Sequence, residues 1–131
     1  MPNVTNFDTE ERYILLPVFI LAKDGKRYEF DALLDSGAPA TEFSDASLQY
    51  LGFIETPRDN VKIKPGMQTQ KYGKTILPEI EICSHSIKDL PVYISHFDKS
   101  WGIDALIGLD FFRQFKVTVD YKKACLITES L

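Results

Sequence analysis

The residue of this sequence best placed to do chemistry is Asp35, a carboxylate at the end of an apolar run. Residues 27–34 alternate in polarity with a period of two, which predicts a half-buried strand that ends at Asp35. Gly37 follows, and glycine allows the backbone to turn sharply and to approach other groups closely. A carboxylate at such a junction either caps a turn or acts in catalysis, and Asp-Ser-Gly is in itself common turn chemistry.

A second apolar segment lies far downstream, with the sequence Ala105-Leu106-Ile107-Gly108-Leu109-Asp110-Phe111-Phe112. Residues 103–108, Ile-Asp-Ala-Leu-Ile-Gly, repeat the pattern of residues 30–35, Phe-Asp-Ala-Leu-Leu-Asp, and a candidate helix follows each copy. The repeat places Gly108, which has no side chain, where the first copy carries Asp35.

These two segments, in this order, resemble the two half-motifs of retropepsin-like aspartic proteases. The first is Ala32-Leu33-Leu34-Asp35-Ser36-Gly37-Ala38 with Thr41 after it, and the second is Leu106-Ile107-Gly108. The resemblance covers roughly residues 13–128. It implies a small closed β-barrel of the acid-protease type, in which each lobe is a diverged duplication with one catalytic carboxylate per chain.

The resemblance also implies a mechanism and a partner. Hydrolysis of a peptide bond by carboxylates needs two of them, one ionised to activate a water and one protonated to polarise the carbonyl. A homodimer with both Asp35 residues on its two-fold axis supplies the pair. In that arrangement Ser36, Gly37 and Ala38 form the active-site loop. Ser36 hydrogen-bonds across the interface and Gly37 offers its backbone to the substrate.

A hairpin beginning at residue 61 and running to residue 82 occupies the place of the family's substrate-covering flap. Under the resemblance Lys64, Pro65 and Gly66 lie near its tip and, with Tyr72, are the candidates for contact with a substrate. From the pattern alone, an ordinary surface hairpin is an equal alternative, and surface packing is an alternative for Tyr72.

Two positions depart from the viral members of the family. Viral enzymes usually carry an Asp two residues after the motif glycine and an Arg just after the downstream glycine, and the two form an ion pair. Pro39 and Leu109 stand there in this chain. Both charges are missing together, which points to a cellular or bacterial branch and leaves no unpaired charge.

The rest of the chain predicts an all-β domain with one or two short helices. Many short apolar runs are separated by turn residues, such as Asp24-Gly25. Ser44 and Gly52 are expected to bound a helix over 45–51, and Asp110 to cap a second one. Pro17 favours an edge strand over 13–21. We expect a loose segment over 1–12 and a single domain over 13–131.

The composition limits the binding partners and the cellular location that we expect for this chain. The net charge of −4 and the scattered basic residues argue against nucleic acid. The absence of a long apolar run and of a leader pattern argues against membrane insertion, and it predicts a cytoplasmic chain or a soluble part of a longer tethered protein. The peptide or protein substrate and the homodimer remain as expected partners, with no cofactor.

The cysteines and histidines of the chain are the remaining candidates for a metal site or a disulfide. Cys83, His85 and His96 have a spacing that matches no common metal site, so we expect none. Cys83 and Cys125 do not form a Cys-x-x-Cys, and two reduced core thiols are the favoured interpretation. The sequence therefore predicts an aspartic peptidase. The alternative is a catalytically inactive protease-fold module that dimerises or binds peptides, because fold does not fix function.

Overall fold

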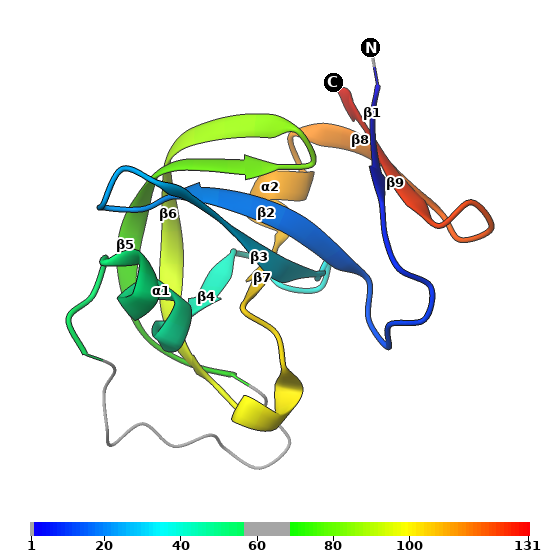
Figure 1. The fold of residues 1–131 in the computed structure, drawn as a ribbon. Helices are drawn as coiled ribbons and strands as arrows, with labels where there is room; N and C mark the ends of the chain where they lie inside the picture. The colour runs from blue at the N-terminus through cyan, green and yellow to red at the C-terminus, as the bar shows by residue number, and fades with distance from the viewer. Residues whose placement is uncertain (1, 57–68) are drawn as a thin grey trace.

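A computed structural model describes residues 2–56 and 69–131 of the chain and shows a β-barrel with a small sheet beside it (Figure 1). The barrel closes in the order β2-β3-β7-β4-β6-β5. Its strands are β2 (Leu15–Leu21), β3 (Arg27–Leu34), β4 (Glu42–Ser44), β5 (Thr69–Ile82), β6 (His85–Phe97) and β7 (Ala105–Ile107). The fold class predicted from the sequence is confirmed.

Alternation of side chains builds the barrel core. In β2, Leu16, Val18 and Ile20 are fully buried, while the residues between them are only partly covered. The partner β3 follows after a turn at Gly25, whose φ of +84° favours glycine. The expectation of an edge strand at Pro17 was wrong, because β2 lies between β3 and β5. Pro17 is tolerated since the pairing with β5 begins only at Val18.

Two short helices and one 3-10 turn interrupt the strands: α1 (Asp45–Leu51), η1 (Lys99–Trp101) and α2 (Leu109–Phe112). The limits of α1 agree with the prediction, because the Ser44 side chain accepts from the Ser47 N–H and Gly52 ends the helix with a φ of +88°. The cap of α2 was wrongly assigned, since Gly108 is its N-cap and Asp110 lies in its first turn. No described helix is long and apolar enough to cross a membrane.

The small sheet has the order β1-β9-β8, with β1 (Asn3–Asn6), β8 (Phe115–Asp120) and β9 (Cys125–Ser130). The two ends of the chain therefore lie side by side (Figure 1). The structure differs here from the loose segment expected over 1–12, because residues 3–6 form a strand against β9. A four-residue strand with a mixed polar sequence has too weak a pattern to be recognised without its partner.

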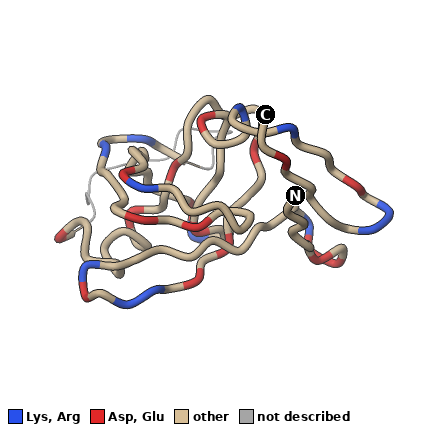
Figure 2. Tube along the Cα trace, turned by 90° about the horizontal axis from the view of Figure 1, so that it is seen from above, with Lys and Arg blue, Asp and Glu red and all other residues tan. Residues whose placement is uncertain are grey.

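Charged residues of both signs are distributed along the described part of the chain. Lys and Arg positions are interspersed with Asp and Glu along the described trace (Figure 2).

Cys83 and Cys125 are free and buried. Burial raises the pKa of the Cys83 thiol, against the opposing effect of a hydrogen bond with Thr5.

His85 connects the barrel to the small sheet. Its ring stacks on Phe115 at a centroid distance of 4.1 Å, and its Nε2 lies 2.9 Å from Oγ1 of Thr128. Burial lowers the pKa of His85 below its ordinary value of 6.5. The unfolded chain then binds a proton more readily than the folded chain, so the stability supported by neutral His85 is lost as the pH falls below about 6.5.

We expect the His85→Gln variant to lose less stability on acidification than the wild type. The free energy of unfolding is measured by urea titration at pH 7.5 and pH 5.5 for both proteins. Glutamine keeps a polar group near Thr128 but cannot titrate, so the difference between the two proteins should shrink at the lower pH. A difference that stays constant between the two pH values would contradict the assignment to His85.

Candidate active site

The loop after β3 holds Asp35 through its backbone. The Asp35 N–H donates to the Ile107 carbonyl at 3.0 Å, and the Asp35 carbonyl accepts from the Ala38 N–H at 3.1 Å, which closes a tight turn. The side-chain Oδ1 accepts from the Gly37 N–H at 3.1 Å. The carboxylate is half-buried, Ser36 and Gly37 are exposed, and Ala38 points into the interior. Asp35 is thus fixed in position with one oxygen engaged within its own turn.

The second half-motif crosses directly beneath this loop. The Leu109 N–H donates to the Ala38 carbonyl at 2.8 Å. A Cβ atom at Gly108 would lie 2.7 Å from the Ala40 carbonyl carbon and 2.8 Å from the Ala38 carbonyl oxygen. Both are backbone atoms that cannot rotate away, so the close approach of the two loops requires glycine at this position.

A buried threonine and an aspartate join the two loops. Thr41 is completely buried, and its Oγ1 accepts from the Gly108 N–H at 3.2 Å and donates to Oδ1 of Asp110 at 2.8 Å. The Thr41 N–H donates to the other oxygen, Oδ2, at 3.0 Å. The sequence assigned Asp110 only a capping role. A polar residue inside an otherwise apolar half-motif was the available signal for this brace.

The strands β3 and β7 run parallel, with Ala32 opposite Ala105 and Leu34 opposite Ile107. This register is the same as the repeat seen in the sequence. It places Asp35 and Gly108 at equivalent ends of the two strands, so one end carries a carboxylate and the other carries none.

Asp104, the residue just before β7, is the next carboxylate to consider as a partner for Asp35. Asp104 accepts from the Asp31 N–H at 3.2 Å through its Oδ2. Burial raises the pKa of Asp104, this hydrogen bond opposes the rise, and the Asp31 charge adds to it. Asp31 lies four residues before Asp35, which is about 13 Å along an extended strand. Asp104 therefore lies at the far end of the ladder from Asp35 and cannot share a water molecule with it.

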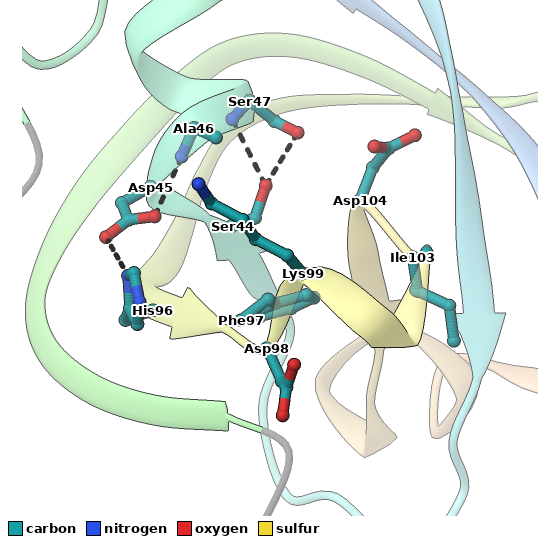
Figure 3. A pocket seen from close by; sticks show the side chains of 11 residues that line it. Ser44, Asp45, Ala46, Ser47, His96, Phe97, Asp98, Lys99, Ile103 and Asp104 are labelled. Carbon is teal, nitrogen blue, oxygen red and sulfur yellow. Dashed lines mark hydrogen bonds and ion pairs between the residues drawn. The ribbon is translucent and has the colours of Figure 1, made fainter. Parts of the chain in front are cut away.

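A hollow of about 320 Å³ lies between the start of α1, the end of β6 and the η1 loop (Figure 3). The buried Asp45 forms one wall: its Oδ2 lies 3.0 Å from His96 Nδ1 and accepts from the Tyr72 hydroxyl at 3.0 Å. Asp104 lies on the opposite side of the hollow (Figure 3). Tyr72, a candidate for substrate contact, is thus placed with its hydroxyl toward Asp45. This cluster was not found from the sequence, because its members come from three separate elements.

The remaining residues that the sequence predicted for the site are the flap candidates and the second half-motif. Lys64, Pro65 and Gly66 lie outside the described residues. The half-motif residues Leu106 and Ile107 are buried in β7 directly beside the Asp35 strand. Within residues 2–56 and 69–131, no group of three or more His, Cys, Asp and Glu side chains is arranged to hold a metal ion.

Asp35 is not among the residues that line the hollows of about 320, 360, 330 and 540 Å³ on the described part of the chain. One of about 330 Å³ is lined by Tyr13, Leu15 and Trp101, and Leu15 pairs with Leu33, two residues before Asp35. A second of about 360 Å³ begins at Ala40, in the Asp35 loop. Both hollows are thus lined by residues close to Asp35, either in the same loop or in the strand paired with β3.

Comparison with known proteins gives a fold and no closer relationship. No family model matches the sequence, and no curated protein matches it either. Among solved structures, a retropepsin-like aspartic protease from Rickettsia conorii has a TM-score of 0.65 and 16% identity, over 98% of this chain and 90% of that one. The retroviral protease-like domain of Ddi1 from Leishmania major has a TM-score of 0.59 and 17% identity, over 91% and 94%. The chain has a retropepsin-like fold.

Proposed function

We propose that this chain is an aspartic endopeptidase whose site is completed by a second copy of the chain. The observation that carries the proposal is the fixed, half-exposed Asp35 at the end of the β3–β7 ladder, with Gly108 at the equivalent position. The retropepsin-like fold supports it, since the two solved structures with this fold described above are an aspartic protease and a protease-like domain.

In the proposed reaction, the two Asp35 carboxyl groups share one proton and hold a water molecule between them. Carboxylates about 3 Å apart do not both ionise, a behaviour for which this class of enzyme is the standard example. The ionised Asp35 takes a proton from the water as its oxygen attacks the peptide carbon. The protonated Asp35 donates a hydrogen bond to the carbonyl oxygen. The C–N bond then breaks, and a carboxyl proton passes to the leaving nitrogen.

The need for a second copy follows from the positions and hydrogen bonds of the other two candidate carboxylates, Asp104 and Asp110. Asp104 lies at the other end of the ladder, and Asp110 uses both oxygens to hold Thr41. A single chain can therefore hold a water molecule with one carboxylate but lacks the acid that polarises the carbonyl.

The test is cleavage of a degenerate peptide library at several protein concentrations, between pH 3 and pH 7. We expect products that a pepstatin-type inhibitor suppresses, and a specific activity that falls on dilution together with the dimer fraction seen by sedimentation. Added Asp35→Asn chains should lower the activity further, because mixed dimers contain one competent carboxylate. Constant specific activity in a demonstrably monomeric sample would refute the shared site. Peptide binding without cleavage would favour the inactive module.

A further inference from the structure

Two adjoining hollows lie along the β5–β6 hairpin, and one of them is also lined by a residue of the Asp35 loop. Two hollows, of about 360 Å³ and about 540 Å³, share Lys74 and Pro91 as lining residues and so adjoin each other. Ala40, five residues after Asp35 in the same loop, lines one end, and Ile76 lines the other. We call this surface the Lys74 groove.

The pairing of the two strands explains the shape and the apolar character of the groove. Lys74 pairs with Tyr93 and Ile76 pairs with Pro91, so these four side chains lie on one face of the hairpin. Ile76 is 56% exposed, one of few large apolar side chains left open on the described surface. The alternate residues Leu90 and Val92 also line the hollow, but their side chains are buried on the opposite, core-facing side of β6.

A positive charge lies at the centre of the groove. The ammonium groups of Lys74 and Lys71 each lie 4.8 Å from the centre of the Tyr93 ring. The buried carboxylate of Glu42 pairs with Lys71 at 3.6 Å. Among residues 2–56 and 69–131, no carboxylate lies within 4.0 Å of the Lys74 ammonium.

The one acidic residue in the groove does not neutralise this charge directly. Asp110 lines the end near Ala40, but both of its oxygens accept hydrogen bonds from Thr41. Lys74 therefore remains the cation that a ligand would meet over the Tyr93 ring. A ligand carboxylate there would be partly shielded from water by the ring and by Pro91, which strengthens a charge-assisted hydrogen bond.

We propose that the Lys74 groove binds an extended segment of the peptide substrate beside the bond that is cut, with an acidic side chain at Lys74 and an apolar side chain at Ile76. Residues two apart in a strand and in an extended peptide are both about 7 Å apart, so an acidic-x-apolar sequence matches the two positions. This inference rests on the proposed function, because it specifies the substrate class of that site.

The test compares Glu-x-Leu peptides with the matched Gln-x-Leu peptides, each in degenerate flanking sequence. Cleavage by the wild type gives kcat/KM, and fluorescence anisotropy with the Asp35→Asn variant gives the binding affinity without cleavage. We expect about a tenfold preference for Glu, expressed in KM and in binding and reduced by salt. In Lys74→Met the ratio between the two peptides should approach one.

Lys88→Met is the matched control, since it removes an exposed lysine from β6 outside the groove and should keep the preference for Glu. Ile76→Ser tests the second position and should remove discrimination between Leu and Ser in the peptide. Cleavage with equal kcat/KM for Glu and Gln would overturn the groove and leave the peptidase intact. Tenfold preference in binding with no cleavage would support the groove and overturn the proposed function.

Discussion

The Asp35→Asn variant is expected to lose at least about a thousandfold in kcat, because an amide cannot accept the proton that the water must give up. The fold should survive the change. The only hydrogen bond found for the Asp35 side chain within the described residues is the one from the Gly37 N–H, and the carbonyl oxygen of asparagine accepts the same bond. Loss of activity can therefore be assigned to chemistry when the melting temperature is unchanged.

Asp104→Asn is the control for this experiment, because it makes the same change at a carboxylate that lies at the far end of the β3–β7 ladder. The Asp104 side chain accepts from the Asp31 N–H, which asparagine can also do. Turnover of the library is measured for both variants at equal concentration, with sedimentation of each sample. We expect Asp104→Asn to keep activity within a few-fold of the wild type. Comparable turnover by purified Asp35→Asn would remove Asp35 from the mechanism.

Gly108→Ala is expected to be the most damaging glycine-to-alanine change among the glycines that the structure describes. The added carbon would lie 2.7 Å and 2.8 Å from backbone atoms of Ala40 and Ala38, and relief requires the two loops to separate. Overpacking of this kind costs about 3 kcal/mol in free energy of unfolding. The loop that separates also carries Asp35, so activity should fall even in the fraction that remains folded.

Gly73→Ala provides the comparison, because its Cβ would lie 3.3 Å from the Ile94 Cδ1 atom, the end of a flexible side chain. We expect less than about 1 kcal/mol of change there, since a side chain can shift where a backbone carbonyl cannot. Urea titration of both variants measures the difference. Equal stability of the two variants would show that the loops over Gly108 can move apart without cost.

The sequence predicted the parts of the fold that depend on local chemistry. Ser44 and Gly52 bound α1 because capping bonds and a positive φ are properties of one or two residues. The repeat of residues 30–35 at 103–108 predicted two equivalent halves, and the β3–β7 register joins those halves residue for residue. Each of these features is visible in a short window of sequence.

The parts that the sequence did not predict depend on partners far along the chain. Asp110 braces Thr41 across the molecule, and Asp45 meets His96 and Tyr72 from three elements. The strand over residues 3–6 exists only because β9 is there to pair with it. Period and propensity carry no information on such contacts, since they describe a residue and its near neighbours only.

The pairing of β1 with β9 also sets a limit on when β1 can form during folding. Asn3 pairs with Thr128, and Ala32 pairs with Ala105, so contacts that close both the sheet and the barrel span most of the sequence. Such non-local contacts slow folding, because the intervening loop must be closed before any contact is gained. A nascent chain cannot form β1 until residues 125–130 have left the ribosome. The small sheet therefore forms later in synthesis than the Asp35 loop, whose partners in the second half-motif are residues 107–110.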